Sequence, residues 1–262
     1  MSASLHIEDL TPEALNFLKA HDQRKASMQV DFPWYPWGTM HNFPHLNRLL
    51  TGTHRDLGTL IGSGTAVDIG AADGDLAFFM ESRGVPMHVV DYPPTNHNGC
   101  RGVHALKREL GSAIEILETD LDSQFALPQA RYEFAFFLGI LYHIKNPFFV
   151  LEALAKSARH AVISTRIASH NLPKGSKAGS AGTNASRVEL ASVPMGYLLA
   201  PDECNNDATN YWIFSDAGLR RVLHRSGWDV LDFMTVGAVG KSDPATPEGD
   251  ERAFCLVKSR YI

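Results

Sequence analysis

The residues with the clearest chemical potential are the acids and glycines of VDIGAADGD, at positions 67–75. Asp68 lies in an apolar run typical of a buried strand, and Gly70 and Gly74 follow it. Glycines in such a turn let backbone N–H groups at a helix start approach a ligand without a Cβ clash. Carboxylates beside these amides disfavour a phosphate and favour a ligand with positive groups. The segment therefore predicts a ligand-binding loop, in which Ala71 also takes part.

Two further acids follow the next two predicted strands. Asp91 ends the second strand, where a carboxylate can accept both hydroxyls of a ribose. Asp120 follows the third strand, where an acid can meet an adenine amino group. A nicotinamide dinucleotide is disfavoured, because Ala72 stands where the GxGxxG pattern has its second glycine. Together these residues predict an adenosine-containing ligand of another kind.

Alternating strand and helix patterns must position these residues. The runs that predict strands are Thr65–Ile69, Met87–Val90, Ile114–Glu118, Phe134–Leu138, Ala161–Thr165, Val230–Val236 and Ala253–Lys258. Helical segments between several of them favour a parallel sheet with helices on both faces. We therefore predict an α/β fold, a Rossmann-like and mostly parallel sheet of about seven strands, with an N-terminal helical extension.

The same patterns divide the chain into two parts. Residues 1–62 are predicted to form a helical and aromatic cap, with a helical pattern over 11–27 and the cluster FPWYPWG at 32–38. Residues 63–262 are predicted to form the Rossmann-like domain. Within that domain a Gly- and Ser-rich stretch predicts a flexible insertion on the substrate side, over 172–212.

Composition excludes several classes of protein. The chain has 262 residues, 44% of them hydrophobic, and a net charge of −5. That charge weighs against a protein that coats nucleic acid or anionic membrane, because such proteins need a basic face. Three dispersed cysteines predict reduced thiols, and no ligand spacing suggests a metal. Without a signal peptide or a membrane-length apolar run, we expect a cytoplasmic protein with no membrane partner. The oligomeric state stays open.

The segment FLGILYHIKNP, at 137–147, resembles the LGxLYHxxxP segment of one subgroup of class I S-adenosylmethionine-dependent methyltransferases. The glycine loop is similar to theirs. That subgroup includes tRNA wobble-uridine modifying enzymes and sugar or small-molecule O-methyltransferases. FPWY at 32–35 and NYWIFS at 210–215 resemble aromatic segments of these relatives, with Pro36 where they have histidine. The resemblance covers residues 32–236 and implies a methyltransferase with S-adenosylmethionine as its cofactor.

The resemblance also implies roles for individual residues. The glycine loop would surround the methionine part, Asp91 would hold the ribose, and Gly139 would form the floor near the sulfonium. Aromatic residues before the loop would cover the methionine end, although packing is an equally expected role for them. The implied cofactor-binding residues are Trp34, Tyr35, Asp68, Gly70, Ala71, Gly74, Asp91, Tyr92, Asp120, Leu121, Leu138 and Gly139.

His143 and Arg166 are the candidate catalytic residues on the acceptor side. Each follows a predicted strand, at the edge where open α/β sheets bind ligands. His143 could act as a base, but a ring hydrogen-bonded to the loop that shapes the cofactor pocket is the favoured interpretation. Arg166 could bind an acidic acceptor or pair with a surface acid.

We expect methyl transfer to a small molecule, at an oxygen of a sugar or secondary metabolite. One alternative is a tRNA wobble-uridine modifying enzyme that uses S-adenosylmethionine or a carboxylated derivative. Net charge makes nucleic acid the less favoured partner without excluding tRNA. The other alternative is a non-catalytic cofactor-binding module.

Overall fold

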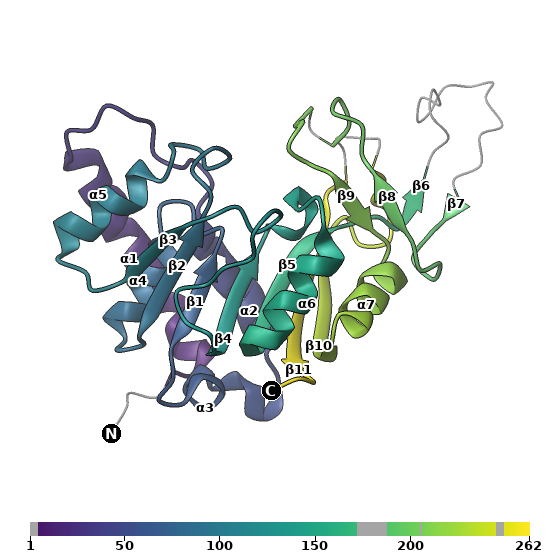
Figure 1. The fold of residues 1–262 in the computed structure, drawn as a ribbon, viewed down its shortest axis with the longest axis horizontal. Coiled ribbons are helices and arrows are strands. Elements are labelled where there is room, and N and C mark those ends of the chain that lie inside the picture. The colour runs from purple at the N-terminus through teal and green to yellow at the C-terminus, as the bar shows by residue number, and fades with distance from the viewer. Residues whose placement is uncertain (1–4, 172–187, 205, 245–248) are drawn as a thin grey trace.

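The computed structural model describes residues 5–171, 188–204, 206–244 and 249–262. Its centre is a sheet of nine strands (Figure 1). Seven of them form one continuous path. In chain order these are β1 (Ala66–Ile69), β2 (Met87–Asp91), β3 (Glu115–Glu118), β4 (Tyr132–Leu138), β5 (Ala158–Ile167), β10 (Trp228–Gly237) and β11 (Glu251–Ser259).

The strand order along the path is β10-β11-β5-β4-β1-β2-β3. Strands β1 to β5 pair in parallel, and β11 runs antiparallel to both of its neighbours, β5 and β10. The carboxyl ends of β1, β2 and β4 therefore lie at one edge, which the first residues of β11 also reach. The predicted Rossmann-like, mostly parallel sheet is confirmed.

Helices cover both faces of the sheet (Figure 1). They are α1 (Ile7–Ser27), α2 (Phe43–Leu49), α3 (Leu57–Ile61), α4 (Asp75–Ser82), α5 (Arg101–Leu110), α6 (Pro147–Ser157) and α7 (Asp216–Arg225). Alternate residues of each strand pack against different helices, as the period of two requires. Ala66 of β1 shares a core cluster with α1 to α5, whereas Val67 shares one with α6 and α7.

Four short strands lie beyond β5. They are β6 (His170–Asn171), β7 (Val188–Glu189), β8 (Gly196–Leu198) and β9 (Trp212–Phe214). β8 pairs with β9, and Phe214 of β9 pairs with Ile167 at the end of β5. Much of the predicted 172–212 insertion, residues 172–187, lies outside the described residues. Its flexibility stays a prediction.

The N-terminal helix begins earlier than its sequence pattern indicates. The pattern starts at Thr11 and Pro12, but α1 begins at Ile7 and contains Pro12 within its early turns. The Thr11 hydroxyl donates to the Ile7 carbonyl at 2.7 Å instead of capping the helix. The apolar face of α1 joins the same core cluster as β1, and the division of the chain at residue 62 stays a prediction. No helix within the described ranges is long and apolar enough to cross a membrane.

Candidate active site

The glycine loop between β1 and α4 needs both of its glycines. Gly70 has φ +70° and Gly74 has φ +83°, which is left-handed backbone that favours glycine. A Cβ on Gly70 would lie 2.1 Å from Ile140 Cδ1, and one on Gly74 would lie 2.8 Å from Val103 Cγ2. The loop is therefore packed against the segment after β4, with Ala71 buried beside it.

Asp68, on β1, has a buried carboxyl with no hydrogen bond from any described residue. Its side chain belongs to a residue that is only 5% exposed. Burial, together with the nearby carboxylates of Asp91 and Asp75, raises the pKa of Asp68 to about 8. A positive group beside Asp68 would stabilise its ionised form, since opposite charges lower a carboxyl pKa.

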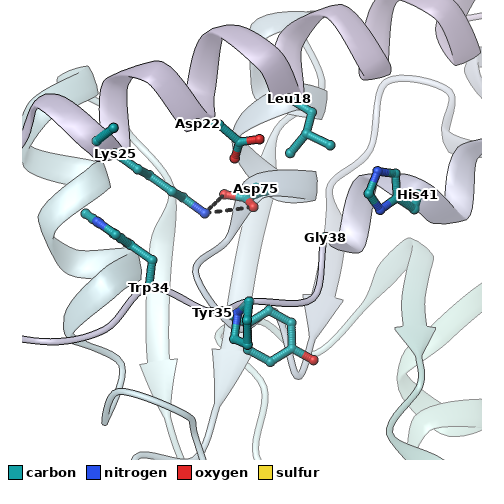
Figure 2. Close-up of a pocket in the computed structure, with 10 residues that line it drawn as sticks. Leu18, Asp22, Lys25, Trp34, Tyr35, Gly38, His41 and Asp75 are labelled. Atoms are coloured by element: carbon teal, nitrogen blue, oxygen red, sulfur yellow. Dashed lines mark hydrogen bonds and ion pairs between the residues drawn. The ribbon is translucent and has the colours of Figure 1, made fainter.

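Two acids of the loop are held by α1, an arrangement that sequence reasoning missed. Lys25 of α1 lies with its Nζ 3.2 Å from Asp73 Oδ2 and 2.8 Å from Asp75 Oδ1. Figure 2 shows Lys25 and Asp75 pointing toward each other. His21 Nε2 lies 3.4 Å from Asp75, but burial lowers the pKa of His21 to about 4, so this ring is neutral. Lys25 is therefore the cation that fixes the loop to the N-terminal helix.

Asp91, at the end of β2, connects its strand to the glycine loop. Its Oδ2 accepts from the Ala72 N–H at 2.9 Å and from Asn96 Nδ2 at 3.0 Å, and its Oδ1 accepts from the Tyr92 N–H at 2.7 Å. Burial raises the pKa of Asp91, and these hydrogen bonds oppose the rise. The carboxyl is half-buried, and each oxygen retains acceptor capacity for a further donor.

The predicted adenine-side residues follow β3. The Asp120 carboxylate accepts from the Asp122 N–H and from the Ser123 hydroxyl, both at 3.0 Å, so it organises its own turn. Leu121 is buried beside it, and Tyr92 is half-buried at the end of β2. These residues lie at the same edge of the sheet as Asp91.

The aromatic segment lies against the loop. The Tyr35 N–H donates to Asp73 Oδ2 at 2.9 Å, and Lys25 Nζ lies 5.5 Å from the Trp34 ring centroid. A cavity of about 310 Å³ lies between this segment, α1 and the start of α4 (Figure 2). The Tyr35 hydroxyl points away from the Lys25–Asp75 pair in Figure 2. Burial and the neighbouring Tyr142 raise the pKa of Tyr35 to about 12, and the positive charge of Arg252 opposes the rise.

The floor at the end of β4 is open above Gly139. Gly139 has φ +74°, and its N–H donates to the carbonyl and hydroxyl oxygens of Ser164, both at 3.0 Å. A Cβ on Gly139 would lie 3.7 Å from Arg252 Nη1 and 3.8 Å from the Tyr142 hydroxyl. Leu138, just before it, is half-buried. Gly139 thus faces two polar side chains rather than packed hydrocarbon.

His143 lies in the short 3-10 helix Leu141–His143. Its Nδ1 is 3.0 Å from the Thr209 carbonyl oxygen, which can only accept, so Nδ1 carries the proton in the neutral ring. Burial lowers the pKa of His143, and the hydrogen bond to Thr209 opposes that change. The contact is the loop hydrogen bond that the favoured interpretation expects, while a role as base stays a prediction.

Arg166 is buried at the end of β5. Its Nε lies 2.7 Å from Asp250 Oδ1, and its Nη1 contacts the Cys204 thiol. Arg252 of β11 lies directly opposite Arg166 in the sheet register, and its Nε donates to Asp250 Oδ2 at 3.3 Å. Sequence reasoning missed Arg252, although it immediately precedes the predicted strand Ala253–Lys258. Had the last strand been predicted as antiparallel to its neighbour, Arg252 at its start would have been placed at the edge where the parallel strands end.

A comparison with known families identifies the enzyme class. A protein-family model described as "Methyltransferase domain" matches residues 41–232. This chain belongs to that family. The prediction of an S-adenosylmethionine-dependent class I methyltransferase is confirmed, while the subgroup with the LGxLYHxxxP segment stays a prediction. No curated protein sequence matches the methyltransferase.

Solved structures share its fold. The N-terminal domain of EvdMO1 with SAH (S-adenosylhomocysteine) bound is 13% identical, with a TM-score of 0.53 and 97% of each chain covered. An S-adenosylmethionine-dependent methyltransferase from Mesorhizobium loti is 16% identical, with a TM-score of 0.53, and covers 83% of this chain and 97% of its own. A putative methyltransferase from Bacillus halodurans is 9% identical, with a TM-score of 0.52, and the match covers 77% of this chain and 95% of that one. At these identities the likeness concerns the fold.

The residues of the loop fit the cationic cofactor of the methyltransferase. Asp68, Asp73, Asp75 and Asp91 converge on the loop, and Lys25 pairs with only two of them. A sulfonium and an ammonium group would supply the positive charge that Asp68 lacks. Within the described part of the chain, no group of three or more His, Cys, Asp or Glu side chains is arranged to hold a metal ion.

Proposed function

We propose that this methyltransferase transfers a methyl group from S-adenosylmethionine to an oxygen of a small-molecule acceptor. The buried carboxyl of Asp68, unpaired among the described residues, is the observation that carries the cofactor assignment. Burying this carboxyl without a partner lowers the stability of the free protein. A positively charged ligand beside Asp68 would offset that loss. The open floor at Gly139, with polar side chains above it, supports an acceptor site next to that ligand.

Each predicted cofactor residue receives a role in this proposal. Asp68, with the amides of Gly70, Ala71 and Gly74, holds the methionine part. Asp91 accepts from the ribose hydroxyls, and Tyr92, Asp120 and Leu121 flank adenine. Leu138 and Gly139 form the floor below the reacting methyl group. Trp34 and Tyr35, from the proposed cap of residues 1–62, cover the methionine end.

Bound S-adenosylmethionine supplies an activated methyl group on a sulfonium. The protein then has to align the acceptor oxygen in line with that methyl carbon, and positioning is the main catalytic contribution. The oxygen lone pair forms the new C–O bond while the S–C pair stays on sulfur, and the hydroxyl proton leaves to solvent or to a base. His143 holds the loop at Thr209 over this site, and Arg166 holds Asp250.

A neighbouring structure supports a small acceptor with hydroxyl groups. The N-terminal domain of EvdMO1 has been crystallised in the presence of SAH and D-fucose, and it is 14% identical to this chain with a TM-score of 0.52. A sugar or a similar polyol is therefore the first acceptor class to test.

The proposal is tested by combining binding with turnover. Calorimetry of the full chain with SAH should show micromolar binding, and labelled S-adenosylmethionine should label a member of a sugar and hydroxylated-metabolite panel. Total tRNA at low salt, where phosphate contacts are strongest, is the arm that tests the nucleic-acid alternative. SAH binding without transfer to any acceptor would instead indicate a non-catalytic binding module.

A further inference from the structure

The acceptor side contains an arginine that the cofactor assignment does not use. Arg252 is the second residue of β11, and the antiparallel pairing with β5 brings it to the edge where the parallel strands end. Its Nη1 would lie 3.7 Å from a Cβ on Gly139, the proposed floor beneath the reacting methyl group. We propose that Arg252 binds a carboxylate of the acceptor, an inference that rests on the proposed methyl transfer.

The contacts of Arg252 fix its guanidinium without using all of its donors. Its Nε donates to Asp250 Oδ2 at 3.3 Å, and the neighbouring Tyr142 and Asp250 raise the pKa of Arg252 against the effect of burial. Its guanidinium carbon lies 5.7 Å from the centroid of the Tyr142 ring. A guanidinium has five N–H donors in a planar fork, so donors remain for a ligand. The side chain is 36% exposed, which leaves them accessible.

Arg252 and Arg166 depend on the same carboxylate for their ion pairs. Asp250 serves both arginines, since its Oδ1 pairs with Arg166 at 2.7 Å while its Oδ2 accepts from Arg252. Among described residues in contact with either arginine, Asp250 is the only acid. The Cys204 thiol beside Arg166 does not compensate, because burial raises its pKa and keeps it neutral. Two guanidinium groups thus form their ion pairs with one carboxylate, while Asp207 acts on the same region without an ion pair to either of them.

A planar carboxylate matches the remaining donors of the Arg252 guanidinium in charge and in shape. Guanidinium and carboxylate groups form paired, parallel hydrogen bonds that set orientation as well as affinity. Arg166 is poorly placed for this task, because its side chain is 5% exposed and already contacts Asp250 and Cys204. The acceptor class is therefore a small hydroxy acid, whose carboxylate lies on Arg252 while a neighbouring hydroxyl faces the methyl group.

Matched acid and neutral probes test the inference. The full chain, saturated with SAH, would be titrated calorimetrically with D-glucuronate against D-glucose, and with 3,4-dihydroxybenzoate against 3,4-dihydroxybenzamide. In at least one pair we expect the acid to bind at least tenfold more tightly than its neutral partner. R252Q should abolish that preference while its SAH affinity stays within threefold of wild type, which also shows that it folds. K258Q, which removes an exposed cation from the other end of β11, should keep the preference.

The outcomes separate this inference from the proposed function. Equal or absent binding of acid and neutral members in both pairs would overturn the carboxylate site, and so would a preference that survives R252Q. Methylation of tRNA without any response to the acids would overturn it as well. In each of these cases SAH binding by the wild type would leave the cofactor assignment standing. Failure of the wild type to bind SAH would overturn the proposed function and the inference together.

Discussion

The glycine-loop side and the β5–β11 side of this sheet edge present different charged groups. On the side of the glycine loop, Lys25 pairs with Asp73 and Asp75, whereas Asp68 has no partner among described residues. On the side of β5 and β11, two arginines share Asp250. A positively charged cofactor and a negatively charged acceptor would each meet the opposite charge. The contrast suggests that charge orders the two ligands before any specific contact forms.

The two sides also differ in how they are assembled. Three of the four acids lie within the continuous segment 67–75, and their positions follow from one strand and one turn. The basic side depends on the register between β5 and β11, which are far apart in the sequence. A local motif therefore encodes the cofactor side, whereas tertiary pairing creates the acceptor side.

The largest expected effect comes from removing the anchor of the acidic side. Lys25→Met leaves Asp73 and Asp75 buried without their cation, which should lower the free energy of unfolding by about 3–5 kcal/mol. Urea denaturation measures this change. Lys19→Met, at an exposed position of the same helix, is the control and should shift stability by no more than about 0.5 kcal/mol. Equal effects of the two substitutions would show that the Lys25 network does not stabilise the loop.

Asp91→Ala should break cofactor binding without breaking the fold. Losing charge-assisted hydrogen bonds to the ribose should weaken SAH binding by at least about 1.5 kcal/mol, or roughly tenfold. Calorimetry provides the measurement. Glu118→Ala is the matched control, since Glu118 lies opposite Asp91 in the β2–β3 register and pairs with His104. Undiminished SAH binding by Asp91→Ala would refute the ribose assignment.

Asp68→Asn should change how the stability of the unliganded protein depends on pH, which tests the buried carboxyl of the acidic side. The pKa of Asp68 is about 8 in the folded chain against its ordinary value of 3.8, so the folded state keeps a proton that the unfolded state releases. Wild-type stability conferred by this proton is present below about pH 4 and is lost as pH rises through 8. Asparagine stays neutral at every pH. The free energy of unfolding of the variant, relative to that of wild type, should therefore rise by about 1–3 kcal/mol from pH 5 to pH 8.

Melting temperatures of the unliganded proteins at both pH values would reveal this gain, at roughly 2–4 °C per kcal/mol. Asp229→Asn, at an exposed position of β10, should show no such dependence. SAH affinity of Asp68→Asn should fall, because the variant cannot offer a negative charge. A variant with unchanged pH dependence would mean that Asp68 is already ionised in the free protein.

The smallest expected effect concerns His143. Glutamine can keep a donor toward the Thr209 carbonyl, so His143→Gln should reduce turnover by less than about tenfold, with the pH profile unchanged. Steady-state rates across pH on an identified acceptor test this expectation. A loss of more than about a hundredfold, with the acidic limb of the profile removed, would instead make His143 the general base.

Sequence patterns predicted the parts of this molecule that local chemistry determines. The seven main strands are apolar runs bounded by turns, and each run named from the sequence falls on one strand of the path. The short strands β8 and β9 carried no such pattern. The sequence around Lys25 shows only a lysine near the end of an amphipathic helix. Its pairing with Asp73 and Asp75 depends on how α1 packs against the glycine loop, which no local pattern indicates. Arg252 was hidden for the same reason.

The reversed direction of β11 has a consequence for how this enzyme could diversify. In a fully parallel sheet, a loop leading into a strand lies at the opposite edge from the ligand. Here Asp250 and Arg252, at the start of β11, lie at the edge where the parallel strands end and where we propose that the acceptor binds. Insertions or substitutions just before β11 could change substrate choice while every residue around the glycine loop is kept. A new specificity would then evolve without a new binding site for the methyl donor.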